Sequence, residues 1–141
     1  MHNELYFLCR KICGRTEAKL CRLFQEFGLN SAQGSIAFLV LRSGEEGITL
    51  TKLHEETGIA MSALSATVQA IRAKGFVCVT PAADDSRKKI IAATKKLRAL
   101  TERLREIEAE VHFALCRKIG EERLRDVCEA LSEIVSVQRN A

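Results

Sequence analysis

The chain has 141 residues, of which 47% are hydrophobic and 28% are charged. This length and composition are typical of one globular domain with a packed core, and they exclude a disordered or low-complexity protein. The net charge of +4 is too small to indicate a nucleic-acid partner by itself, although the stretch from Arg87 to Arg98 contains six basic residues and no acidic one.

The sequence indicates a cytoplasmic protein with no membrane partner. The longest apolar runs, such as Ile36–Leu41, are much shorter than the roughly 20 residues that cross a bilayer. The N-terminal stretch MHNELYFLCRKI has neither the basic start nor the cleavage site of a signal peptide. The six cysteines include no CxxC pair, and a reducing compartment would keep them as thiols.

Two helices are expected in the first third of the chain. Apolar residues recur at helical spacing from about Asn3 to Phe27, and Gly28 follows as a helix-ending residue. Asn30 or Ser31 then starts a second helix, and the sequence SGEEG at 43–47 ends it.

The middle of the chain predicts two further helices joined by a short turn. Thr49–Thr57 forms the first of them, and Gly58 supplies the turn. The second runs from Met61 to Lys74, and its apolar residues form one stripe: Leu64, Val68 and Ile71.

A β-hairpin is expected to follow these helices. Phe76–Thr80 is apolar and β-branched and is predicted as a strand, which Pro81 ends because proline cannot donate to a ladder. Residues 82–87 form the tip, and Lys88–Ala93 forms the return strand. Helix, turn, helix and hairpin together are the pattern of a winged helix-turn-helix, which binds duplex DNA through its second helix.

The last third of the chain is predicted to be helical. Leucine, isoleucine and valine keep a spacing of three and four in a coiled-coil-like seam, and Gly120 breaks this long helix before a final one. The first and last helices are too apolar to stand alone, so we expect them to meet, as in a dimer. The seam consists of Leu97, Leu100, Leu104, Ile107 and Val111.

Three motifs carry a resemblance to a known family. They are LHEETGI at 53–59, KGFV at 74–77 and DDSR at 84–87, and Thr94 follows at the expected distance. With these motifs the chain resembles regulators of the MarR (multiple antibiotic resistance regulator) family.

The resemblance implies a mainly α fold with a small β-hairpin wing. Residues 31–93 would form the winged helix-turn-helix lobe of a single MarR-like domain, and residues 1–29 and 95–141 its helical dimerisation region. It also implies a homodimer that binds double-stranded, pseudo-palindromic operator DNA at half-sites roughly 10 base pairs apart. Most members are repressors that a small-molecule effector or thiol oxidation releases.

The candidate DNA contacts follow from this register. Arg87 would enter the minor groove with Asp85 orienting its guanidinium, and nearby lysines would contact phosphates. Base readout falls to Ser62, Ser65 and Gln69, because alanines stand where the family often has polar or basic residues. The alanines are Ala60, Ala63, Ala66 and Ala70; the phosphate contacts are Lys88, Lys89, Lys95 and Lys96, with Thr49, Thr51 and Lys52 as weaker candidates.

The cysteines suggest two further hypotheses. Cys9, Cys13 and Cys21 lie in the first helix, where hydroperoxide-sensing members of the family have a reactive thiol, so redox sensing is one. A zinc site is the weaker one, because it would need the Cys9–Cys13 pair to meet His112 and Cys116 from another helix. We therefore expect no metal and no cofactor.

Two rival functions remain to be compared with a DNA-binding regulator. The alanine-rich second helix would also suit a protein-interaction or dimerisation module that has lost DNA binding. An enzyme is not expected, because the sequence has no phosphate-binding glycine loop, no HExxH motif and no nucleophile elbow.

Overall fold

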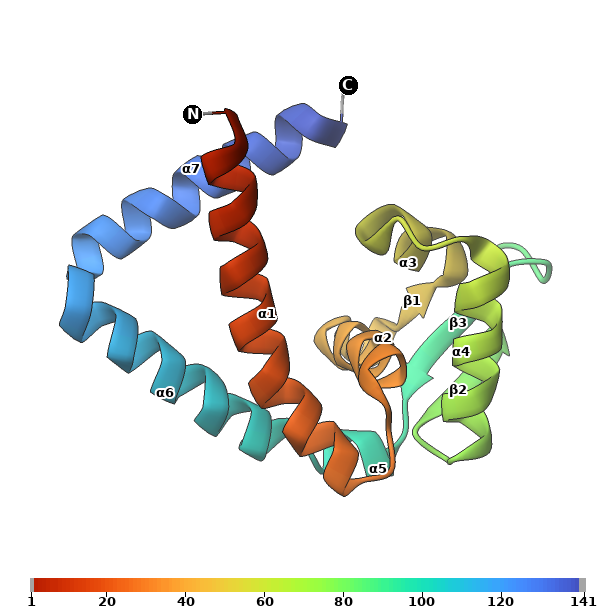
Figure 1. Ribbon diagram of the computed structural model, residues 1–141. Coiled ribbons are helices and arrows are strands. Elements are labelled where there is room, and N and C mark those ends of the chain that lie inside the picture. The colour runs from red at the N-terminus through yellow and green to blue at the C-terminus, as the bar shows by residue number, and fades with distance from the viewer. Residues whose placement is uncertain (1, 140–141) are drawn as a thin grey trace. The chain divides into compact units, whose positions relative to one another are not determined.

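A computed structural model describes residues 2–139, which fall into two units, Met1–Glu102 and Arg103–Ala141 (Figure 1). The first unit holds most of the elements and is mainly helical, with one small sheet. In chain order these elements are α1 (His2–Glu26), α2 (Ser31–Arg42), a 3₁₀ turn (Gly44–Glu46), β1 (Ile48–Thr49), α3 (Leu50–Thr57), α4 (Met61–Ala73), β2 (Val77–Pro81), β3 (Lys89–Ala93) and α5 (Lys95–Arg98).

The junction of α1 and α2 is fixed by local hydrogen bonds and close packing. Asn30 caps α2 by accepting a hydrogen bond from the backbone N–H of Gln33 (2.9 Å), and the Gln33 side chain accepts one from the backbone N–H of Asn30 (3.2 Å). Gly28 adopts a φ of 78°, which confirms its predicted place after α1. A Cβ on Gly34 would lie 2.9 Å from the Phe24 ring, so glycine allows α1 and α2 to pack closely.

The helix-turn-helix forms as the sequence predicts. Thr49 is the N-cap of α3, with its hydroxyl accepting a hydrogen bond from the backbone N–H of Lys52 (3.1 Å). Gly58 ends α3 with a φ of 70°, a left-handed conformation that glycine adopts without strain. The stripe of α4 is buried as predicted, together with Leu53 of α3: Leu64, Val68 and Ile71.

The sheet has three antiparallel strands in the order β1–β3–β2. Two features differ from the sequence-based prediction. The short strand β1 was not predicted; it pairs Ile48 with Ile91 of β3. Pro81 does not end the pairing but lies opposite Lys89, which an edge strand such as β2 permits.

The predicted long helix after the sheet is divided in two. α5 ends at Arg98, and α6 (Thr101–Ile119) starts after Ala99 and Leu100. Most of α6 belongs to the second unit, where Gly120, with a φ of 83°, separates it from α7 (Glu121–Arg139) as predicted. None of the helices within residues 2–139 combines the length and apolarity that crossing a bilayer requires.

Candidate nucleic-acid interface

The second helix of the helix-turn-helix, α4, has one buried and one exposed side. Leu64, Val68 and Ile71 anchor it in the core, whereas the predicted base contacts lie on the other side and are exposed. Burial of these three aliphatic side chains stabilises this orientation by several kcal/mol. The predicted base contacts Ser62, Ser65 and Gln69 are exposed, and so are Ala63 and Ala66 of the helix and Ala60 just before it.

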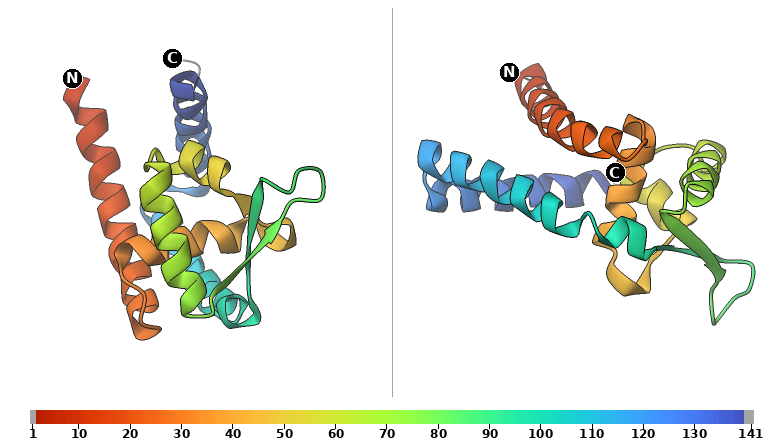
Figure 2. Two further views of the ribbon diagram at one scale, coloured as in Figure 1. Left: turned by 90° about the vertical axis from the view of Figure 1, so that its right-hand side faces the viewer. Right: turned by 90° about the horizontal axis from the view of Figure 1, so that it is seen from below.

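The wing carries the predicted minor-groove residue at its tip. The Asp85 carboxylate accepts a hydrogen bond from the backbone N–H of Arg87 (3.0 Å) and lies 3.4 Å from its Nε. The Arg87 side chain is 92% exposed, and both views of Figure 2 show the loop between β2 and β3 extending away from the helices of the first unit. Asp85 thus orients the Arg87 guanidinium through its Nε, while most of the side chain stays exposed to solvent.

Two lysines next to Arg87 keep their charges available. Lys88 and Lys89 are exposed, and no carboxylate within residues 2–139 forms an ion pair with either. The backbone of the tip is closed by hydrogen bonds from Lys88 N–H to the carbonyl of Asp85 (3.1 Å) and from Ala82 N–H to the carbonyl of Lys88 (2.9 Å). The cations are therefore carried on an ordered turn.

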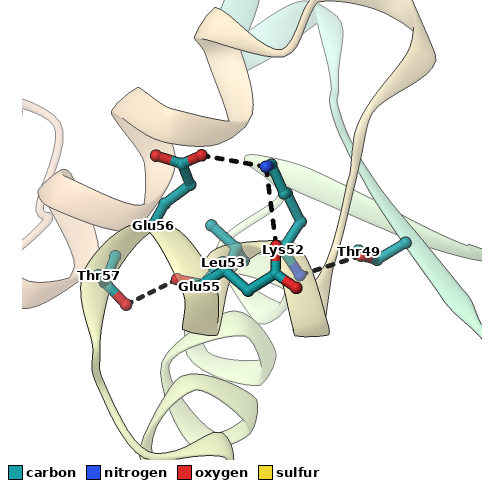
Figure 3. A network of polar contacts seen from close by, with 6 residues as sticks. All are labelled: Thr49, Lys52, Leu53, Glu55, Glu56 and Thr57. Atoms are coloured by element: carbon teal, nitrogen blue, oxygen red, sulfur yellow. Dashed lines mark hydrogen bonds and ion pairs between the residues drawn. The ribbon is translucent and has the colours of Figure 1, made fainter. Parts of the chain in front are cut away.

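The first turn of α3 presents a different electrostatic environment (Figure 3). The Lys52 ammonium lies 3.3 Å from a carboxylate oxygen of Glu56 and 3.7 Å from one of Glu55. A phosphate would have to compete with both carboxylates for this ammonium. Thr51 is exposed, and Thr49 uses its hydroxyl as the N-cap. Among the predicted contacts, the wing lysines are thus better placed than Lys52.

Two lysines near the end of α4 have roles that the sequence did not reveal. Lys74 Nζ donates to the carbonyl oxygen of Gly28 (2.6 Å) and to Gln33 Oε1 (2.9 Å). Lys96 Nζ donates to the carbonyl oxygen of Lys74 (2.8 Å) and lies 4.4 Å from the centre of the Phe76 ring. The predicted phosphate contact of Lys96 would require both interactions to be given up, since they hold its ammonium in place.

The candidate redox cysteines are free thiols that differ in exposure. Cys13 is exposed, and Cys9 and Cys21 are half-buried. Cys21 Sγ lies 3.2 Å from the hydroxyl of Ser31. Within the described residues, no group of three or more His, Cys, Asp and Glu side chains could hold a metal ion, although Cys116 Sγ lies 3.4 Å from His112 Nε2 on α6.

A cavity of about 420 Å³ lies in the first unit between α1, α2 and the turn after α3. Its lining is mostly apolar, and Glu17 is its single charged residue. Thr57 and Ile59 form part of its wall; the Thr57 hydroxyl accepts a hydrogen bond from Ile59 N–H (3.1 Å), and His54 Nδ1 lies 2.7 Å from the Ile59 carbonyl oxygen. A molecule in this cavity would touch the turn of the helix-turn-helix.

Comparison with known proteins gives matches among solved structures. Neither a scan against protein-family models nor a search of curated proteins finds a match. The S. aureus MepR–DNA complex superposes with a TM-score of 0.73 at 20% identity, covering 94% of this chain and 96% of MepR. CouR from Rhodococcus jostii RHA1 bound to p-coumaroyl-CoA gives 0.75 at 21% identity, covering 94% of this chain and 92% of CouR.

The chain is also similar to a MarR transcriptional regulator from Methanosarcina mazei Go1 over nearly its whole length. Its TM-score is 0.78 at 16% identity, covering 96% of this chain and 90% of that one. These similarities agree with the mainly α fold and the small sheet that the sequence predicts. The described chain has the winged helix-turn-helix fold of MarR-family regulators.

Proposed function

We propose that this protein is a MarR-family transcription regulator that binds double-stranded operator DNA sequence-specifically. The observation that carries the proposal is the joint exposure of α4 and of a cationic wing tip on one lobe. Buried side chains hold α4 so that its polar residues face solvent, and Arg87, Lys88 and Lys89 supply charge for phosphates and for the minor groove. The S. aureus protein of the same fold is found in complex with DNA.

The proposed assembly is a homodimer on a pseudo-palindromic operator. The N-terminal half of α1 exposes a run of large apolar side chains, among which Ile12 is 60% exposed. On α7, Val137 is 67% exposed and Val135 is 52% exposed. Monomers rarely leave such stretches in water, so a second copy is the partner we propose for them. The exposed large apolar residues of α1 are Leu5, Tyr6, Phe7, Leu8 and Ile12.

The proposed regulation is repression in the cytoplasm that a small molecule or thiol oxidation relieves. The cavity beside Thr57 and Ile59 supports the first signal, because its occupant would press on the turn between α3 and α4. Cys21 lines the same cavity and supports the second signal, together with Cys9 and Cys13 on α1. CouR, which shares the fold, is found with p-coumaroyl-CoA bound.

DNA binding is tested by fluorescence anisotropy with duplexes that flank the protein's own gene, at about 50 mM salt. We expect Arg87→Ala to weaken binding about tenfold, because a charge-assisted contact is lost. Arg22→Ala, which removes an exposed arginine from α1, is the matched control and should leave the affinity unchanged. The proposal fails if the wild-type protein does not bind these duplexes, or if Arg87→Ala binds as well as wild type.

A second candidate function is a protein-interaction or dimerisation module without DNA binding. It is favoured by α4, which has no basic residue between Met61 and Ile71. Such a module would show negligible affinity for any duplex and no dependence of that affinity on salt. The anisotropy titration therefore separates the two functions.

A further inference from the structure

We propose that α4 selects A·T base pairs in the major groove, with Gln69 as the residue that recognises adenine. This inference rests on the proposed function, and it names the class of operator that the protein binds. It rests on the side chains that α4 exposes and on the absence of charged residues from Met61 to Ile71.

The outward row of α4 consists of three exposed residues. Ala66 and Gln69 follow Ser62 by four and seven positions, so the three side chains lie on one face of the helix. This face is opposite the buried stripe of Leu64 and Val68. A helix that enters the major groove with its core side anchored would present this row to the base edges.

The chemistry of the row excludes the usual contacts to G·C pairs. Guanine is recognised by Arg or Lys through its N7 and O6, and cytosine by Asp or Glu through its amino group. No residue of these four types occurs from Met61 to Ile71. Arg72 belongs to the last turn of α4, ten residues after Ser62, and lies outside the row of Ser62, Ala66 and Gln69.

Gln69 has the groups that adenine requires. Its amide offers one acceptor and one donor side by side, which match the amino group and N7 of adenine. No other side chain exposed between Met61 and Ile71 carries such a pair. The serines can bond to either kind of base pair, and Thr67 already donates its hydroxyl to the carbonyl of Ala63 (3.0 Å).

The apolar side chains that α4 exposes suit the thymine that pairs with adenine. Thymine alone presents a methyl group in the major groove, and alanine is one of the side chains that contact it. Ala66 lies one turn before Gln69, and Met61, 41% exposed, lies near the start of the helix. A·T-rich DNA also has the narrow minor groove that attracts arginine, so Arg87 on the wing favours the same sequences.

The experiment begins with selection of bound duplexes from a random library, followed by base substitution in the selected half-sites. We expect A·T pairs to dominate both half-sites. Replacing the contacted thymines by deoxyuridine removes only their methyl groups and should weaken binding about fourfold per contacted methyl. This substitution leaves the protein, the phosphates and the Watson–Crick pairing unchanged.

Variants of Gln69 test the adenine contact directly. Gln69→Ala should reduce the preference for adenine over guanine at one position of each half-site by roughly 5- to 160-fold, and Gln69→Arg should select guanine there. Gln25→Ala, an exposed substitution on α1, is the control and should leave the preference unchanged. Circular dichroism would verify that each variant is folded.

The outcomes separate this inference from the proposed function. G·C-rich selected sites, or an unchanged affinity for deoxyuridine half-sites, would overturn the inference, while weaker binding by Arg87→Ala would still support a DNA-binding regulator. Absence of wild-type binding to every duplex at low salt would overturn both.

Discussion

The wing lysines should determine how steeply DNA binding falls with salt. Lys88 and Lys89 are exposed and form no ion pair within the described residues, so each can replace a counterion on the phosphate backbone. Each phosphate contact contributes about 0.9 to the slope of log K against log salt. Four such lysines in a dimer contribute about 3.6, which corresponds to about 150-fold in affinity between 50 and 200 mM salt.

The test compares wild type with the Lys88→Ala/Lys89→Ala double variant by anisotropy on one duplex across this range of salt. The slope should fall by about 3.6 if all four ammonium groups contact phosphates. Lys11→Ala/Lys19→Ala removes the same charge from exposed positions of α1 and is the matched control. Equal slopes for wild type and the wing variant would refute the wing lysines as phosphate contacts. An equally large fall of the slope in the control would refute them too, because net charge alone would then explain the effect.

Three further predictions concern the framework that holds α4 and the wing, and chemical denaturation measures each of them. Leu64→Ala should destabilise the fold by about 2–5 kcal/mol, because Leu64 is fully buried, and a loss below about 1 kcal/mol would contradict its place in the core. Gly47→Ala should lower the free energy of unfolding more than Gly44→Ala does. Both glycines have positive φ, but only at Gly47 would a Cβ lie 2.6 Å from the carbonyl oxygen of Ile91. Equal losses of stability in the two variants would argue against that contact. Thr94→Val should cost about 1–3 kcal/mol, because the hydroxyl lies 2.6 and 3.0 Å from two backbone carbonyl oxygens, and a neutral substitution would mean that these bonds contribute nothing.

The helices were predictable because their signals are local. Periodic apolar residues define α1, α2 and α4, and capping residues mark their ends: Asn30 closes a capping box, and Gly28, Gly58 and Gly120 adopt positive φ. The buried stripe of α4 follows from a spacing of three and four residues. Each of these features depends on neighbours within one or two turns, which a single sequence contains.

The features that the sequence did not predict depend on distant partners. β1 has only two residues and no alternating pattern, and it exists because Ile48 and Thr49 pair with β3 about forty residues later. The division between α5 and α6 occurs in the sequence LRALTE, which contains neither glycine nor proline. Buried Leu97 and Leu100, on either side of Ala99, keep the apolar spacing of a continuous helix.

In the candidate site, too, the features that depend on local sequence were predicted and those that depend on distant partners were not. Exposure of Ser62, Ser65 and Gln69 was expected from the helical period, and the ion pair between Asp85 and Arg87 from their place in the tip. The DNA contacts themselves stay predictions. The interactions of Lys52 and Lys74 differ most from the sequence-based prediction, because a sequence shows that a lysine is charged but not which group it contacts. The carboxylates beside Lys52 are in its own helix, whereas the partners of Lys74 include Gly28, 46 residues away.

The hydrogen bonds of Lys74 have a mechanical consequence for the proposed base contacts of α4. They hold the C-terminal end of α4 against the segment that leaves α1, whereas Ala60 at the other end has no side-chain cap. Ser62 lies twelve residues before Lys74, or about 18 Å along the helix axis. A tilt of about 5° around the fixed end would displace Ser62 by about 1.6 Å, which is enough to break a hydrogen bond to a base. A movement at Gly28 that tilted α4 would therefore be larger at the proposed base contacts than at Lys74.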